Sequence, residues 1–311
     1  MNSKEDHNQY YSDSEIDFGE IINVFKKNLV SIILITSVFA ISSVFYALSL
    51  QNIYTSQSIL KLANDSGNNS LSSLSSDFGG LASLAGVSLP SGGGDKSDYA
   101  IELLKSKEFV KHIANFENIK QNIMAVKKYD LNTTTLIYDE NIFNTKNKEW
   151  VRNPPPGRLK EPSYLELHEK INEQMSITRD RKTGFIKISF EHQSPVFAYN
   201  FLRLVIRELN QITKKIELDE SQSSLNYLYT ELPKINEREV RDSINNIIES
   251  QLKIQMLANV RSDYMLQTID APYIPEVKSK PSRSIICIIS TIVGFIVSIL
   301  FILIRLFIYR I

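Results

Sequence analysis

Two apolar segments, 29–50 and 284–304, lie near the two ends of this 311-residue chain, and they constrain its fold more than any other feature. Each has about the 20 residues that a helix needs to cross a hydrocarbon core of roughly 30 Å. Neither contains a charged residue, whereas residues 51–283 are polar enough to fold in water. The sequence therefore predicts a two-span membrane hairpin that carries one large domain.

The positive charges beside the spans predict the orientation. Lys26 and Lys27 precede the first span, and Arg305 and Arg310 flank the end of the second. Basic residues next to short tails stay in the cytoplasm, while a long loop is translocated largely regardless of its charges. We therefore expect a cytoplasmic tail, a first span, an exported domain, a second span and a second cytoplasmic tail at 1–28, 29–50, 51–283, 284–304 and 305–311.

Composition narrows the possible functions. The chain has 35 Lys and Arg residues against 35 Asp and Glu residues, so no strongly basic surface indicates nucleic acid as a partner. The single cysteine, Cys287, falls inside the second span. The exported domain therefore cannot form disulfides, and its stability must come from core burial and assembly.

Three strands and two long helices are predicted in the exported domain, with the strands in a base near the membrane. Residues 53–62, 185–190 and 265–269 are rich in β-branched and aromatic residues or alternate in polarity, as strands do. Asp98 is placed to cap a helix that begins the folded core, and a short helix is expected at 164–171. The predicted fold class is α+β, with the three strands in an α/β base.

Two long helices are predicted within 195–262. Apolar residues recur at alternating spacings of four and three from Ala198 to Ile216, which is typical of a coiled-coil-like seam. Pro233 interrupts this pattern, and a second apolar stripe follows from Val240 to Leu257. The helices are expected to protrude from the base, and the pattern leaves open a hairpin within one chain or packing between subunits.

Two stretches lack a regular pattern. Residues 64–97 are dominated by Ser, Gly and Asn, and Gly79, Gly80 and Gly86 mark a candidate mobile loop. This loop could line a central cavity or lie on the surface. Residues 129–162 contain Asn and Thr clusters and a proline run, so an irregular insertion is expected there.

The return to the membrane is rich in proline. Pro272, Pro275 and Pro281, with Arg283, form a candidate functional connector over 271–283. Each proline fixes φ and removes a backbone donor, so the segment can neither extend a strand nor start the second helix early. The connector could merely orient the domain, or it could transmit contact between the domain and a membrane partner.

Small residues recur every four positions in the second span. Ser290, Gly294 and Ser298 create a groove that another helix can approach closely, so they are candidate helix-packing residues. Both self-association and packing against a partner enzyme fit this pattern.

No pattern in the sequence predicts catalysis. The Gly-rich run at 92–97 places Asp95 where a phosphate-binding loop requires glycine before its lysine. The histidines have no metal-ligand spacing, and no cysteine in the exported domain supports them. We therefore expect no catalytic residue, metal or cofactor. The histidines are His7, His112, His168 and His192.

Several motifs together resemble the Wzz-type polysaccharide co-polymerases, the chain length determinant family without a kinase domain. They are the Asp17-Phe18 pair, the glycine-rich loop, the 257–264 segment, the proline connector and Gly294 with Ser298 in the second span. Two departures are Lys280-Pro281-Ser282, where relatives often have Ser-Pro-Lys, and Ser298, where they often have glycine. Some wider relatives carry a kinase after the second span, and we expect none here because only residues 305–311 follow it.

The resemblance implies a non-enzymatic regulator of surface polysaccharide chain length in the inner membrane of Gram-negative bacteria, most simply of lipopolysaccharide O-antigen. It also implies a ring of identical subunits whose partners are an integral-membrane polysaccharide polymerase, the growing glycan and membrane lipids. Capsule or exopolysaccharide synthesis is an alternative, and a two-span periplasmic sensor or an export scaffold is a second one.

Overall fold

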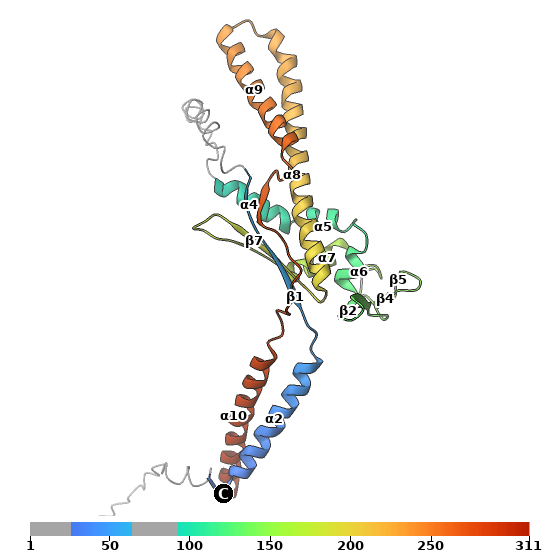
Figure 1. The fold of residues 1–311 in the computed structure, drawn as a ribbon, viewed down its shortest axis with the longest axis vertical. Coiled ribbons are helices and arrows are strands. Elements are labelled where there is room, and N and C mark those ends of the chain that lie inside the picture. Colours follow the sequence, from blue (N-terminus) through green and yellow to red (C-terminus); the bar gives the residue numbers. More distant parts are fainter. Residues whose placement is uncertain (1–25, 64–92, 311) are drawn as a thin grey trace, which may run out of the picture. The chain divides into compact units, whose positions relative to one another are not determined.

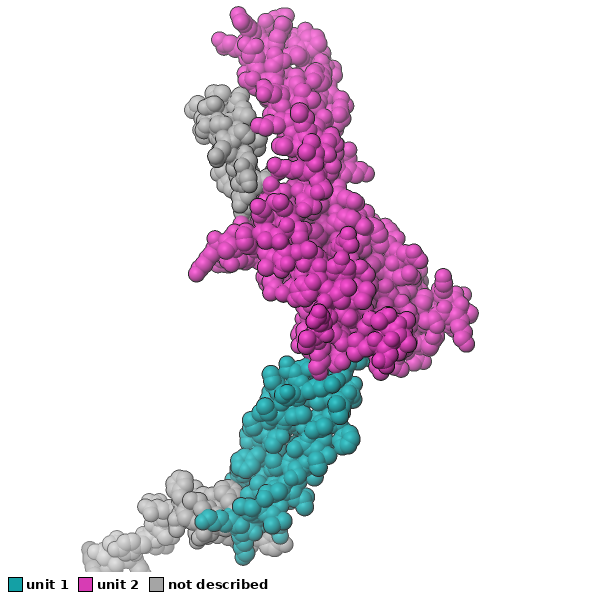
Figure 2. All heavy atoms as spheres, viewed as in Figure 1, with its two compact units in different colours: residues 1–51, 281–311 teal, residues 52–280 magenta. Residues whose placement is uncertain are grey.

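The computed structural model describes residues 26–63 and 93–310. The chain divides into two compact units, one formed by residues 1–51 with 281–311 and the other by 52–280 (Figure 2). The mixed helix and strand fold, with apolar helices at the ends and long central helices, confirms the predicted fold class (Figure 1).

The first unit is a pair of packed helices, α2 (Leu29–Ser49) and α10 (Arg283–Arg310). Helix α10 already begins at Arg283, so this residue belongs to the helix and not to the extended connector. The helix also continues beyond the predicted end of the second span at residue 304. This continuation is physically reasonable because Arg305 is followed by further apolar residues that propagate a helix.

The second unit is built on a four-stranded antiparallel sheet in the order β6-β7-β1-β8. The three predicted strands are present as β1 (Tyr54–Leu62), β7 (Ile186–His192) and β8 (Leu266–Asp270). Strand β6 (Met175–Arg179) was missed by sequence analysis because it follows a helix without an intervening turn signal.

Helix α8 (Pro195–Glu231) packs its first half against β1 and β7 and continues beyond the sheet (Figure 1). Ser194 caps this helix by accepting a bond from the Phe197 N–H at 3.2 Å, and Pro195 occupies the first turn. The apolar stripe predicted as a seam therefore has two roles. Its first part, including Leu202 and Leu209, lies in the sheet core, and only later residues face the second long helix.

The second long helix, α9 (Arg238–Val260), packs against α8 within the same chain after a turn of 3-10 helix at Leu232–Lys234 (Figure 1). Ser221 donates to the Gln251 carbonyl at 3.0 Å, and Leu225 is buried. Of the two arrangements left open by the sequence, the hairpin within one chain is thus present.

The helix expected to begin at Asp98 is two helices, α4 (Gly93–Lys105) and α5 (Lys107–Ile113). Asp98 lies inside α4 and pairs with Arg179 at 3.0 Å, so it is not the helix cap. The helix start at Gly93 also shortens the loop predicted for 64–97. The cap lies instead at Ser106, which accepts from the Phe109 N–H at 3.1 Å and starts α5.

The insertion expected to be irregular contains two short β-hairpins. Strand β2 (Val126–Asp130) pairs with β3 (Thr135–Tyr138), and β4 (Phe143–Asn144) pairs with β5 (Glu149–Trp150). These hairpins could not be predicted because turn-forming residues occupy much of each one. Trp150 packs edge-on against Phe143 at 5.1 Å between ring centroids, so it serves as a packing residue.

Two further helices complete the second unit, α6 (Ile119–Met124) and α7 (Tyr164–Gln174). Helix α7 extends the helix predicted at 164–171 by a few residues. Its start is fixed by a capping box, in which Glu166 N–H donates to Ser163 and the Ser163 N–H donates back to the Glu166 carboxylate at 3.0 Å.

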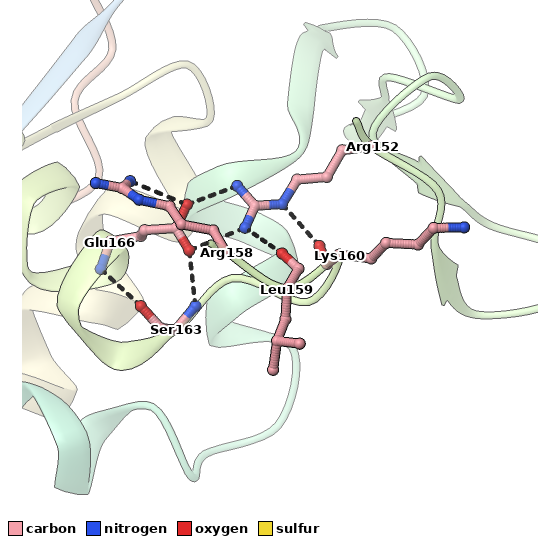
Figure 3. A network of polar contacts seen from close by, with 6 residues as sticks. All are labelled: Arg152, Arg158, Leu159, Lys160, Ser163 and Glu166. Atoms are coloured by element: carbon pink, nitrogen blue, oxygen red, sulfur yellow. Dashed lines mark hydrogen bonds and ion pairs between the residues drawn. The ribbon is translucent and has the colours of Figure 1, made fainter. Parts of the chain in front are cut away.

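Glu166 also holds the proline-containing loop that precedes α7 (Figure 3). Arg152 binds its carboxylate with two bonds, at 2.7 and 2.9 Å, and donates to the carbonyls of Leu159 and Lys160. Arg158 adds a bond at 3.3 Å. The hydrogen bonds from Arg152, followed by the Ser163 N–H and Arg158, hold the pKa of Glu166 at about 2, against an ordinary value of 4.5.

We expect the free energy of unfolding of Glu166→Gln to change less with pH in the acid range than that of the wild type. A carboxylate with a depressed folded-state pKa stabilises the fold above its unfolded pKa, and this contribution is lost as the pH falls through the folded value. The variant should be less stable than wild type by about 1–2 kcal/mol near pH 7. The difference should narrow between pH 4.5 and 2. Urea unfolding followed by Trp150 fluorescence measures it, with exposed Glu169→Gln as the matched control; a constant difference across this range would contradict the assignment.

One buried side chain joins the centre of α8 to the start of β8. Asn210 is 3% exposed, and its Oδ1 accepts from the N–H groups of Met265 and Leu266 at 2.8 and 2.9 Å. Its Nδ2 donates to the Leu266 carbonyl at 3.0 Å. The amide thus satisfies three backbone groups at the point where the chain enters the last strand.

Candidate functional site: the connector and the membrane helices

The proline connector begins where β8 ends, at Asp270. Pro275 is buried and Pro272 is half-buried, so these prolines pack against the second unit instead of standing free in solvent. Because proline has no N–H, the segment cannot extend the ladder between β1 and β8.

Two serine hydroxyls of β1 bond to the backbone where β8 ends and the connector begins. Ser56 and Ser58 are fully buried, and they donate to the carbonyls of Tyr273 at 2.8 Å and Asp270 at 2.6 Å. A buried strand face with serine in two successive inward positions is unusual for a core strand. It is explained here because each hydroxyl donates to a backbone carbonyl at or just after the end of β8.

The far end of the connector is joined to the residues that lead into β1. Ile53 donates to the Lys280 carbonyl at 2.9 Å and accepts from the Ser279 N–H at 2.8 Å. Thr55 donates to the Ser279 hydroxyl at 2.7 Å, and the Lys280 ammonium pairs with Glu191 at 2.7 Å. The two ends of the 52–280 unit are thereby held side by side.

In the first unit, Gly294 of α10 lies directly against Phe39 of α2. A Cβ added at Gly294 would lie 2.6 Å from the Phe39 Cβ and 2.8 Å from its Cγ, which is closer than real contacts allow. Glycine at this position therefore permits the close approach of the two helices. Sequence analysis identified Gly294 but could not identify Phe39 as the group packed against it.

The other two small residues also lie in the interior of the helix pair or next to it. Ser298 is fully buried and donates to the Phe295 carbonyl of its own helix at 2.7 Å. The Ser290 hydroxyl lies 3.4 Å from the Phe39 carbonyl of α2. The groove formed by these residues thus receives the first helix of the same chain, and their part in function stays a prediction.

The structure brings some candidate residues together and leaves others apart. Ser56 bonds to the connector between Pro272 and Pro275, at Tyr273, and Gly294 lies against Phe39 in the first unit. Gly79, Gly80 and Gly86 fall outside the described residues. The signal that could have indicated the serines is their alternation in a strand that leads directly out of a membrane span.

The described histidines make ordinary structural contacts. His112 pairs with Glu208 at 2.9 Å, and His168 contacts the Lys105 carbonyl at 2.7 Å. Burial lowers the pKa of His192 to about 4, so this residue is neutral at physiological pH. Within residues 26–63 and 93–310, no group of three or more His, Cys, Asp or Glu side chains could hold a metal ion.

The two apolar helices define the class of the protein. Leu29–Ser49 and Arg283–Arg305 are long and apolar enough to cross a membrane, and only 6% and 17% of their most apolar windows are buried. Helices that expose this much apolar surface fit a two-pass membrane protein and not the core of a soluble one.

A comparison with known proteins finds one family model that matches part of the chain. Residues 14–115 match the family model described as Wzz, chain length determinant protein. This match covers the first third of the chain and agrees with the resemblance inferred from its motifs. No curated protein matches the chain. A solved structure described as a full-length bacterial polysaccharide co-polymerase is 12% identical, with a TM-score of 0.40, over 94% of this chain and 99% of that chain.

Proposed function

We propose that this protein regulates the chain length of a bacterial surface polysaccharide, most simply lipopolysaccharide O-antigen, without catalysing a reaction itself. The observation that carries the proposal is the match of residues 14–115 to the chain length determinant family. The two membrane-length helices that bracket the 52–280 unit support it.

In this proposal the chain spans the inner membrane twice, with both termini in the cytoplasm and residues 52–280 in the periplasm. Identical subunits form a ring that acts on a separate integral-membrane polymerase and on the growing glycan. The basic residues beside the spans support this orientation. The ring geometry sets how many repeat units are added before release.

The mechanism assigns different tasks to the two parts of the site. The connector is held by the Ser56 hydroxyl at Tyr273 and by Ile53 at Ser279 and Lys280, so it can transmit force between the domain and the second span without first becoming ordered. The α2–α10 pair, packed through Gly294 and Phe39, presents its remaining apolar faces to lipid or to the polymerase.

The deciding experiment is gel profiling of surface glycan from cells that lack this chain and from cells in which it is restored. We expect the modal cluster of bands to collapse to unregulated lengths on deletion and to return on complementation. Complete loss of polymer would favour an obligatory synthesis or export component. An unchanged profile would overturn the proposal.

A further inference from the structure

A groove of about 730 Å³ lies between the first half of α8 and residues 262–272 of the second unit. Its volume is within the range of about 300–1,000 Å³ that is usual for ligand sites. The helix side presents a row of side chains that begins at Tyr199 and ends at Lys214. At 1.5 Å per residue this row is roughly 22 Å long, which suits an extended ligand better than a compact one.

The row is positively charged. Arg203, Arg207 and Lys214 line the groove, and Asp263 is the single acidic side chain among the described residues that line it. Arg207 is partly neutralised because it pairs with Glu208 at 2.9 Å. Arg203 and Lys214 have no carboxylate partner among residues 26–63 and 93–310, so their charges face the groove uncompensated.

Neutral polar groups alternate with these charges. Gln211 lies on the helix side, and Ser262 and Thr268 lie opposite, so donors and acceptors are available on both walls. Tyr199 adds a half-buried aromatic side chain, whose hydroxyl accepts from Arg203 at 3.4 Å. Asn210 also lines the groove, but its amide already bonds to the backbone at the start of β8 and is not assigned to the ligand.

We infer that this groove binds a linear acidic glycan, one whose sugar residues carry carboxylates. Guanidinium and ammonium groups about one and two turns apart recognise repeated carboxylates, the neutral side chains bond to sugar hydroxyls, and Tyr199 offers an apolar face to a sugar ring. The inference rests on the proposed function and deepens it, because it names the chemical class of the polymer that the protein contacts.

The test is a binding measurement on the full-length protein in detergent. A fluorescently labelled hexamer of galacturonic acid is titrated at roughly 50 mM salt, where exposed charges are weakly screened, and anisotropy gives the Kd. We expect Arg203→Glu combined with Lys214→Glu to weaken binding at least about tenfold, because two attractive charges become repulsive. Lys215→Glu combined with Arg238→Glu makes the same change in net charge at exposed positions outside the groove, and should alter the Kd less than about twofold.

Two further probes test the chemical class. A neutral glucose hexamer and a polyglutamate peptide of equal charge should each bind at least about tenfold more weakly than the acidic hexamer. Equal binding of polyglutamate, equal loss in the control variant, or no binding of the acidic hexamer would overturn the inference. These results are independent of the glycan profile. If glycan lengths change on deletion but the groove binds no acidic hexamer, the groove inference alone is wrong. If the groove binds the hexamer but the profile is unchanged, the proposed function alone is wrong.

Discussion

Replacing Asn210 with leucine is expected to lower the free energy of unfolding of the 52–280 unit by about 3–5 kcal/mol. Leucine has the same branching at Cγ but is larger and offers no hydrogen bonds. The N–H groups of Met265 and Leu266 and the Leu266 carbonyl would lose their side-chain partner. Because Leu266 is fully buried, water cannot readily replace these bonds.

Urea unfolding of the full-length protein in detergent, followed by Trp150 fluorescence, measures this effect. Trp150 is the single tryptophan of the chain and lies in the 52–280 unit, so the signal reports on that unit alone. Asn226→Leu is the matched control on the same helix, since Asn226 is exposed and its side chain accepts from the exposed Gln222 at 3.0 Å. It should cost less than about 0.5 kcal/mol. A similar loss in both variants would contradict the anchoring role of Asn210.

The second large effect is expected for Gly294→Leu. The Cβ position at Gly294 already overlaps Phe39, so a larger side chain must push α2 and α10 apart. Overpacking of this kind typically costs about 1–3 kcal/mol. Double electron–electron resonance between spin labels at the exposed positions Leu48 and Ile288, with Cys287 replaced by serine, should show a longer and broader distance distribution.

A compensating change sharpens this test. Phe39→Ala removes the side chain that the leucine would meet, so Gly294→Leu combined with Phe39→Ala should restore most of the original distance distribution. Val293→Leu serves as the control, because Val293 is 45% exposed on the same helix. If the Gly294 variant leaves the distribution unchanged, the close approach does not depend on glycine, and the assigned role of the small residues is wrong.

Elements with a strong repeating pattern could be predicted from the sequence. Both membrane-length helices and the long helices appear because their apolar residues recur over many turns. The predicted start of the long helices at residue 195 coincides with the first residue of α8. Strand β6 and the short hairpins could not be predicted, because their pairing depends on partners distant in sequence and their runs are too short to show a period.

The candidate site was predictable only in part, for a related reason. Proline restricts the backbone and glycine lacks a Cβ wherever they occur, so Pro272, Pro275 and Gly294 could be selected from the sequence alone. Their counterparts could not, because Phe39 is an ordinary apolar residue in a span and Ser56 an ordinary serine in a strand. Only the fold shows that these residues meet.

The paired ends of the 52–280 unit have a thermodynamic consequence for a domain that has no cysteine. Both of its ends continue into α2 and α10, which pack against each other as a separate unit. If this pair stays associated while residues 52–280 unfold, the unfolded segment is a closed loop instead of an open chain. Closing a loop of this length removes conformational entropy equivalent to about 5 kcal/mol in the chain-entropy relation used for cross-links. The membrane helices would then do for this domain what disulfides do for many exported proteins.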